Sequence, residues 1–355
     1  VKLSSNISIT IMQRGLLRMP KLEIIAEIPF KEVITSIELT DLTGDGKDSL
    51  ILTTMNGELR IFDFEVGKKV RTTEIMKTGN LPPVAAMALG DVMGNGVKDF
   101  VLGGLDNMLR VVSYMDDELG VRATTPLGTL PTAICVTNVV SDDSAEVIVA
   151  TADNALRCYG WFDVALDKLA HKVVDRPVFS MKPLKSRGLS FSRFVFGDDS
   201  GYLYVYQYAD DRLHEIHRSK VKGEVSLVAT GAVTGGLSDE ILTISDDKQL
   251  TLHGIDQGEL KQLANIRAPS AITSVQIGHL VDNAGADGQI VSCQGNSNIT
   301  VLSYESKMLT PEASIRPVKK AAEALVALGD VDGNGSVEIV QSVGRTLYLM
   351  SMVPD

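Results

Sequence analysis

The sequence predicts an all-β protein, a seven-bladed β-propeller with four-stranded blades in which the N-terminal strand closes the last blade. Three observations predict it: strand-like segments recur about every 48 residues, the last repeat stops one strand short, and a spare strand precedes the first repeat. The 355 residues are 44% hydrophobic, which is enough for a large core. The 31 glycines and 5% aromatics favour tight turns between strands of small residues.

The repeat is clearest in a strand of about six residues with apolar side chains at alternate positions. Its seven copies begin at Leu59, Leu109, Leu156, Leu203, Leu250, Ile299 and Leu347. Successive copies are separated by 50, 47, 47, 47, 49 and 48 residues. Alternation with a period of two predicts a strand with one buried face, which we interpret as the third strand of each blade.

Two further strands precede each copy. The nearer one is almost wholly apolar and is joined to the third strand by a turn such as Asn56-Gly57 or Asp153-Asn154, whose residues tolerate the positive φ of tight hairpins. The farther one is a run of small residues, such as 84–90, which we expect to lie innermost around the central axis. A ring of such blades is favoured over a solenoid, because a solenoid would leave open edges at both ends.

The chain is therefore expected to form one domain over residues 1–355. Its last repeat ends near Met352, after a third strand, so its fourth strand is missing. Residues 21–30 alternate in polarity and precede the first repeat, and we expect them to supply the closing strand. The alternative is that they belong, with residues 1–20, to a frayed N-terminal extension.

Three loops between first and second strands carry a common motif. Residues 41–48 read DLTGDGKD, residues 91–99 read DVMGNGVKD and residues 330–338 read DVDGNGSVE. These loops resemble the FG-GAP (VCBS-type) repeat of integrin α-subunits. The resemblance implies a seven-bladed propeller with protein-binding faces. The loops look most like the intracellular branch, which includes scaffold propellers of the KICSTOR and Bardet–Biedl complexes.

The resemblance also implies a calcium site, with ligands at loop positions one, three, five, seven and nine. In the last loop these positions hold Asp330, Asp332, Asn334, Ser336 (through its backbone) and Glu338. Calcium prefers six to eight oxygen ligands, which this set can supply. The alternative is that Asp330 only caps a turn by accepting backbone N–H bonds. For the last loop both interpretations stay open, so one calcium ion is the single possible cofactor.

The first two loops lack a full ligand set, and there we favour the turn. Position three is Thr43 in the first loop and Met93 in the second, and a thioether does not bind a hard cation. Asp48 stands one place from the ninth position of the first loop, and we expect its side chain to point away.

No catalytic motif occurs in the sequence. The chain has no GxSxG, GxxxxGK[ST] or HExxH segment, and its five histidines are scattered. We therefore predict that the protein is not an enzyme.

A basic window interrupts this acidic chain in the fourth repeat. It contains Lys182, Lys185, Arg187 and Arg193 and no acidic residue. Such a window can bind an acidic segment of a partner, since Arg suits carboxylate recognition. The alternative is a divergent loop that gained its charges by drift.

Charge and composition narrow the function. The net charge of −11 argues against nucleic-acid binding, and no stretch is long and apolar enough for a membrane span. Three widely spaced cysteines fit a reducing compartment, so we expect a cytoplasmic protein, with export as the alternative. The predicted function is a non-catalytic protein–protein interaction scaffold. An exported, calcium-supported adhesion or carbohydrate-binding propeller is the alternative, and a propeller hydrolase or lyase is the third possibility.

Overall fold

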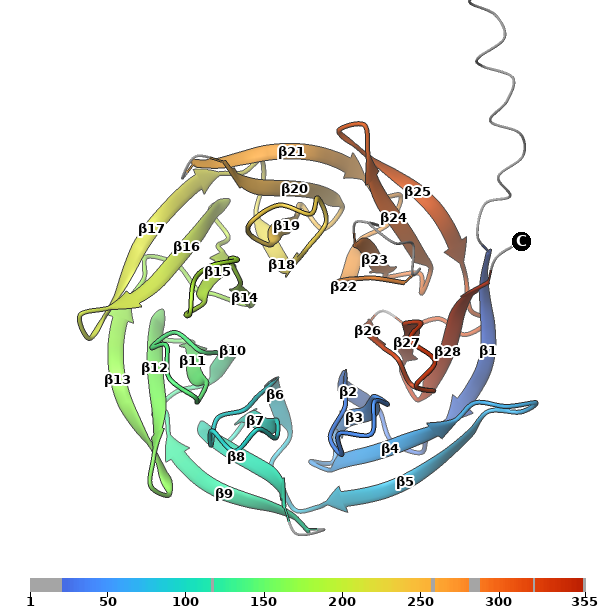
Figure 1. Ribbon diagram of the computed structural model, residues 1–355, viewed down its shortest axis with the longest axis horizontal. Helices are drawn as coiled ribbons and strands as arrows, with labels where there is room; N and C mark the ends of the chain where they lie inside the picture. The colour runs from blue at the N-terminus through green and yellow to red at the C-terminus, as the bar shows by residue number, and fades with distance from the viewer. Residues whose placement is uncertain (1–20, 116–117, 257–258, 281–287, 322, 354–355) are drawn as a thin grey trace, which may run out of the picture.

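The computed structural model describes residues 21–115, 118–256, 259–280, 288–321 and 323–353. Within these ranges the chain forms 28 β-strands and no helix, so none of the described residues lies in a helix that could cross a membrane. The strands form seven four-stranded sheets arranged in a ring (Figure 1). The predicted seven-bladed β-propeller is confirmed, whereas residues 1–20 lie outside the described residues.

Each of the first four blades is a run of consecutive strands. Blade 1 contains β2 (Ile34–Thr40), β3 (Ser49–Thr54), β4 (Leu59–Glu65) and β5 (Arg71–Thr78). Blade 2 contains β6 (Val84–Gly90), β7 (Asp99–Gly104), β8 (Met108–Met115) and β9 (Glu118–Pro126). Blade 3 contains β10 (Pro131–Thr137), β11 (Glu146–Thr151), β12 (Ala155–Phe162) and β13 (Ala165–Val173). Blade 4 contains β14 (Met181–Leu184), β15 (Arg193–Gly197), β16 (Tyr202–Ala209) and β17 (Arg212–Lys220).

The remaining blades follow the same plan, except that the last one takes a strand from the start of the chain. Blade 5 contains β18 (Val225–Gly231), β19 (Glu240–Ser245), β20 (Gln249–Asp256) and β21 (Glu259–Arg267). Blade 6 contains β22 (Ile272–Gly278), β23 (Gln289–Gln294), β24 (Ile299–Glu305) and β25 (Met308–Ile315). Blade 7 contains β26 (Ala324–Gly329), β27 (Glu338–Val343), β28 (Thr346–Val353) and β1 (Lys21–Pro29).

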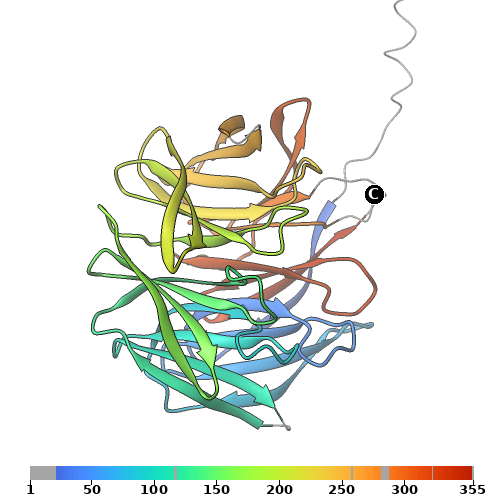
Figure 2. The same ribbon diagram turned by 60° about the vertical axis from the view of Figure 1, so that its left-hand side comes forward.

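The first strand of every blade lies nearest the axis, as predicted, and the fourth lies at the rim (Figure 1). Figure 2 shows the sheets of successive blades stacked against one another. The second strand is therefore covered on both faces, and all its residues are buried in β3, β7, β11, β19, β23 and β27. Burial on both faces explains why these strands read as continuous apolar runs rather than as alternating ones.

The third and fourth strands share a bulge at the same place in every blade. The register shifts between Ile61 and Phe62, Val111 and Val112, Cys158 and Tyr159, Val205 and Tyr206, Leu252 and His253, Val301 and Leu302, and, in the closing strand, Ile24 and Ala26. In each case the fourth strand carries the extra residue. A bulge bends and twists its strand, so it lets each fourth strand curve around the rim.

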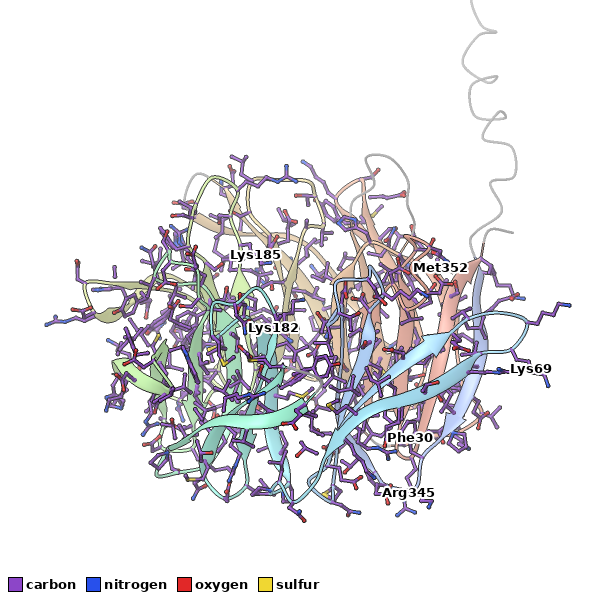
Figure 3. The ribbon with its side chains drawn as sticks, turned by 60° about the horizontal axis from the view of Figure 1, so that its bottom comes forward. Phe30, Lys69, Lys182, Lys185, Arg345 and Met352 are labelled. Atoms are coloured by element: carbon purple, nitrogen blue, oxygen red, sulfur yellow. The ribbon has the colours of Figure 1, made fainter. Side chains whose placement is uncertain are left out.

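The N-terminal strand closes the ring, as predicted. β1 pairs with β28 from Lys21 opposite Val353 to Pro29 opposite Thr346, and the two strands lie side by side in Figure 1. The backbone N–H of Phe30 then donates to the Arg345 carbonyl at 2.8 Å, just as the residue after the fourth strand bonds to the hairpin turn in other blades. Figure 3 shows Phe30 and Arg345 together at one end of the ring. β1 thus matches the fourth strands of the other blades in its pairing, in its bulge and in the hydrogen bond made by the residue that follows it.

Backbone bonds also join neighbouring blades through the loops between first and second strands. In each case the residue before the second strand donates its N–H to the first loop residue of the preceding blade. The pairs are Asp48 to Asp330 (2.8 Å), Ala145 to Asp91 (2.7 Å), Ser192 to Asn138 (2.7 Å), Asp239 to Lys185 (2.9 Å) and Gly288 to Ala232 (3.0 Å). The loops on this face are therefore fixed to a neighbouring blade at these five junctions.

Replacing Leu22 tests the closure. Leu22 is 4% exposed and packs in a cluster with Tyr348 and Met350 of β28, whereas Ile24 on the same strand is 36% exposed. We expect Leu22→Ala to lower the free energy of unfolding by about 2–4 kcal/mol because it leaves a cavity. The matched control Ile24→Ala should cost less than about 1 kcal/mol. Urea denaturation measures both, and equal losses would show that β1 does not pack as described.

Candidate functional site

The loop between β26 and β27 brings three acidic groups together. Asp330, Asp332 and Glu338 each offer a carboxylate oxygen, and these atoms lie within 4.8 Å of one another. They are three of the five residues to which the family resemblance assigns calcium ligation. The other two, Asn334 and Ser336, form part of a turn, in which the backbone N–H of Ser336 donates to Asn334 Oδ1 at 2.7 Å. That bond uses one of the two acceptor sites of an amide oxygen and leaves the other.

Asp330 accepts backbone hydrogen bonds with both carboxylate oxygens. Its Oδ1 accepts from Gly333 N and its Oδ2 from Gly335 N, each at 2.7 Å. These two glycines have φ of 73° and 86°, a conformation that favours glycine because other residues are strained there. The loop is therefore a tight Asx-type turn with its N–H groups directed at one carboxylate.

The same turn occurs in the two loops that lack a full ligand set. Asp41 accepts from Gly44 N at 2.7 Å and from Gly46 N at 2.9 Å. Asp91 accepts from Asn95 N at 2.9 Å and from Gly96 N at 2.7 Å. The turn therefore forms without a complete set of metal ligands, and the position of Asp330 is explained by hydrogen bonding alone.

Glu338 is buried and has a structural bond of its own. Its Oε2 accepts the backbone N–H of Val331, one residue beyond Asp330, at 3.2 Å. Four other blades repeat this bond from the first residue of the second strand: Asp99 to Val92 (2.9 Å), Glu146 to Val139 (2.7 Å), Glu240 to Val233 (2.7 Å) and Gln289 to Leu280 (2.9 Å). The polar residue that opens the second strand thus fixes the start of the loop in five blades.

Sequence reasoning missed this bond, although a signal for it exists. A carboxylate or amide residue precedes the apolar run of the second strand in each of these five blades. A polar residue at the start of a fully buried strand needs a hydrogen-bond partner, and the nearest N–H groups are those of the adjoining loop. Because Gln289 serves in blade 6, the bond requires an acceptor and does not require a negative charge.

The three carboxylates of the blade 7 loop lie close enough to repel one another. The pKa of Glu338 is raised to about 7, mainly by burial and also by the negative charges of Asp332 and Asp330, while the hydrogen bond from the Val331 N–H acts to lower it. A bound cation would relieve the repulsion among the three carboxylates. The cluster could therefore hold a hard cation, with Asp330, Asp332 and Glu338 as ligands.

Asp48 connects this loop to blade 1. Its Oδ2 accepts the backbone N–H of Asp330 at 2.9 Å, and its own N–H donates to the Asp330 carbonyl at 2.8 Å. The side chain thus turns away from its own loop toward the neighbouring blade. These two bonds make the blade 7 loop part of the seam at which the ring closes.

The structure distributes the basic window of blade 4 over three places. Lys182 lies in the inner strand β14, Lys185 and Arg187 lie in the loop of residues 185–192, and Arg193 opens β15, where its Nε donates to Gln207 Oε1 at 3.2 Å. Figure 3 labels Lys182 and Lys185. The four residues therefore do not form one loop surface, and their role in partner binding stays a prediction.

The loop that holds Lys185 and Arg187 is fixed to blade 5. The backbone N–H of Arg187 donates to the Leu237 carbonyl at 2.6 Å, and Asp239 N donates to the Lys185 carbonyl at 2.9 Å. The positive charges of Lys185 and Arg187 act to lower the pKa of Asp239, which burial raises. Part of the basic charge of this loop is thus offset by an acidic neighbour.

Lys182 lines a cavity of about 220 Å³ on the axis of the ring, between inner strands of several blades. Glu38 of β2 lines the same cavity. Burial raises the pKa of Glu38, while the positive charges of Lys182 and Lys98 oppose that shift. The side chains that line the axial cavity thus include one acidic residue, Glu38, and one basic residue, Lys182.

His253 and the thiols of Cys135 and Cys293 lie buried within the blades. His253 is 4% exposed and shares a hydrogen bond with Thr243 Oγ1 at 3.1 Å, and burial lowers its pKa to about 4. Burial raises the pKa of the Cys135 thiol to about 12 and that of Cys293 to about 11, so both stay protonated.

The fold places the chain in the class of seven-bladed β-propellers. No protein-family model matches the chain, and neither does any curated protein sequence. Among solved structures, BBS1N in its complex with ARL6DN is similar, with a TM-score of 0.68 and 12% identity over 93% of this chain and 96% of that one. A chain of the Mitotic Checkpoint Complex has a TM-score of 0.66 and 12% identity over 94% of this chain and 95% of that one. At such identities the likeness shows the fold alone.

Calcium binding at the blade 7 loop stays a prediction that the melting temperature can test. A site with a dissociation constant of about 10 μM would gain about 2.7 kcal/mol in 1 mM calcium. For a chain of 355 residues this corresponds to roughly 4 °C. We expect Asp332→Asn and Glu338→Gln to abolish the shift and the control Asp45→Asn, in the first loop, to retain it.

The variant Glu338→Gln should fold, because Gln289 fills the same position in blade 6. If the unmodified protein melts at the same temperature in calcium and in excess chelator, the calcium site is contradicted and the blade 7 loop is only a turn.

A second prediction concerns the buried acceptor in blade 5. Glu240 is 4% exposed and accepts the backbone N–H groups of Val233 and Thr234 at 2.7 and 3.0 Å. We expect Glu240→Ala to lower the free energy of unfolding by about 1–3 kcal/mol, because it leaves buried N–H groups without an acceptor. Glu240→Gln should cost clearly less, since an amide oxygen can accept the same bond. Urea denaturation compares the two, and equal losses would contradict the acceptor role.

Proposed function

We propose that this chain is a non-catalytic protein–protein interaction scaffold built on an FG-GAP-like propeller. The observation that carries the proposal is a set of large apolar side chains exposed on one face. Met55 and Leu105 are each 54% exposed and Phe179 is 60% exposed. Exposed Met and aromatic side chains from several elements are typical of protein interaction sites.

These three side chains come from different blades but from the same end of the ring. Met55 and Leu105 lie in the hairpins between second and third strands of blades 1 and 2, and Phe179 lies in the connection into blade 4. Antiparallel order places these hairpins and connections on one face, as Phe30 and Arg345 illustrate for blade 7 (Figure 3). We call Met55, Leu105 and Phe179 the apolar face residues.

Rigidity supports the proposal. The loops on the opposite face are bonded to a neighbouring blade at five junctions, and six of the seven second strands are wholly buried. Such a scaffold keeps its exposed side chains in place before a partner binds, which lowers the entropy lost on binding. The similar structures of BBS1N with ARL6DN and of the Mitotic Checkpoint Complex are structures of protein complexes, which is consistent with such a role for this chain.

The FG-GAP assignment rests on the loops that begin at Asp41, Asp91 and Asp330 and on their shared turn. A cytoplasmic location belongs to the proposal and is supported by Cys135, Cys158 and Cys293, all of them free and buried. The net charge of −11 supports a protein partner rather than nucleic acid.

A calcium-supported adhesion or carbohydrate-binding function is the second candidate. The cluster of Asp330, Asp332 and Glu338 is the observation that favours it. The calcium experiment above distinguishes it, because a scaffold of the proposed kind needs no metal to bind its partner.

Replacing the apolar face tests the scaffold. We expect the triple variant Met55→Ser, Leu105→Ser, Phe179→Ser to lose a stoichiometric protein partner that copurifies with the unmodified chain. Loss of an interface anchor costs about 1 kcal/mol or more, so removing three, about 3 kcal/mol together, should weaken binding at least about a hundredfold.

The matched control replaces exposed apolar residues at the rim: Ile24→Ser, Ile75→Ser, Val121→Ser, which are 36%, 37% and 44% exposed. This control should keep the partner. A chain that copurifies no stoichiometric protein, or one that loses its partner equally in both triple variants, would overturn the proposed function.

A further inference from the structure

The axial cavity is bordered by three polar side chains that come from three different blades. They are Glu38 of β2 in blade 1, Lys182 of β14 in blade 4 and Gln276 of β22 in blade 6. These strands are the first in their blades, and Figure 1 shows them around the axis of the ring. The cavity therefore combines a carboxyl group, an ammonium group and an amide group.

These three side chains have no bonded partner within the part of the chain that the structure describes. No hydrogen bond or ion pair joins the side chain of Glu38, Lys182 or Gln276 to another described residue. All three line the cavity and are partly exposed. Polar groups in the interior of a protein normally have a hydrogen-bond partner. The partners of these three groups are therefore molecules held in the cavity.

Two hydroxyl groups that border the cavity differ, because they join neighbouring blades. Ser180 Oγ accepts the backbone N–H of Val228 at 3.0 Å, and Ser274 Oγ accepts that of Val326 at 3.2 Å. These bonds link blade 4 to blade 5 and blade 6 to blade 7. They fix the wall of the cavity in place before a ligand binds, which lowers the entropy lost on binding.

The cavity has room for one small molecule. Its volume of about 220 Å³ equals that of roughly seven water molecules at about 30 Å³ each. Leu227, Val275 and Leu325 contribute apolar wall. An apolar wall with a few well-placed polar groups is typical of small-molecule sites, and a volume this small restricts the ligand to a few non-hydrogen atoms beyond its charged groups.

One acidic and one basic side chain line the cavity, and a third charge lies outside it. Lys182 and Lys98 both act on the Glu38 carboxylate. Lys98 does not line the cavity, since its Nζ donates to Thr40 Oγ1 at 2.7 Å and it also acts on Asp48. Because no ion pair joins Glu38 to Lys182, a molecule placed between them can contact both.

We propose that the axial cavity binds a small zwitterion, an α-amino acid with an aliphatic side chain. Lys182 binds the carboxylate of the ligand and Glu38 binds its ammonium group, each through a charge-assisted hydrogen bond. The Gln276 amide donates to the carboxylate or accepts from the ammonium group. Leu227 and Leu325 contact the aliphatic side chain.

The pair of opposite charges selects a zwitterion over a ligand with one charge. A cation alone would be attracted by Glu38 and repelled by Lys182, and an anion alone would meet the reverse. An α-amino acid carries both charges on adjacent atoms and gives each side chain a counter-charge. Water can fill the cavity, but it supplies neither counter-charge.

The first test uses three matched probes with the same branched aliphatic group: L-valine, isobutylamine, which lacks the carboxylate, and isovalerate, which lacks the ammonium group. The methyl resonances of Leu227 and Leu325, which both line the cavity, report binding by NMR titration. We expect a saturable shift with L-valine and binding at least about tenfold weaker for each of the other probes, because each lacks one charged contact. Equal affinity for all three probes overturns the inference, and so does the absence of a saturable shift with both L-valine and the smaller L-alanine.

Two variants assign the charges. Lys182→Met should abolish the preference for L-valine over isobutylamine, and Glu38→Gln should abolish the preference for L-valine over isovalerate. A merely structural role of either residue would weaken all three probes alike. The controls Glu305→Gln and Lys307→Met alter the hairpin between β24 and β25, away from the cavity, and should keep both preferences. Preferences that survive in Lys182→Met and Glu38→Gln would contradict the proposed site, and the probe series on the unmodified chain decides the question if either variant fails to fold.

This inference goes beyond the proposed function and can fail separately from it. A chain that binds L-valine with the expected preferences and copurifies no protein supports the axial site and overturns the scaffold. A chain that keeps its copurifying partner and shows no saturable shift with L-valine or L-alanine overturns the axial site and leaves the scaffold intact.

Discussion

The pairing of β1 with β28 is the constraint on which the rest of the structure depends. The third strand of a blade is buried only if a fourth strand covers it, and β28 is buried from Thr346 to Met350. Without β1, this strand would present its polar edge and side chains such as Tyr348 to solvent. The other side of the seam is held by the bonds between Asp48 and Asp330. Closure therefore joins the two ends of the described chain in a single sheet and holds every blade between two neighbours.

Closure also explains why the loops between first and second strands are held firmly in place. The loops between first and second strands are bonded outward to a neighbouring blade, and in five blades also inward to a buried acceptor such as Glu146 or Glu240. The exposed residues of these loops are thus held by backbone geometry rather than by their own packing. The same logic gives Glu338 two compatible roles. It accepts a structural N–H bond, and it adds a third carboxylate to a group that could bind a cation.

Sequence alone predicted the seven blades, the inner strands and the closing strand, because a 48-residue period and period-two alternation are local signals. It could not place Lys182, whose strand β14 has only four residues, so that the basic window divides between strand and loop. For Glu338 the family resemblance implied only a metal-ligand role, since its hydrogen-bonding role appears only when Asp99, Glu146, Glu240 and Gln289 are superposed in space.

Native-state hydrogen exchange of the loop amides tests the closed, bonded ring most directly. The informative amides are those of Asp48, Ala145, Ser192 and Asp239, which donate across blade junctions. A closed ring predicts that they exchange nearly as slowly as amides of the buried second strands, because they open only when the blades separate. Exchange at the fast rate of ordinary exposed loops would contradict it, and would show that the loops move independently of the ring.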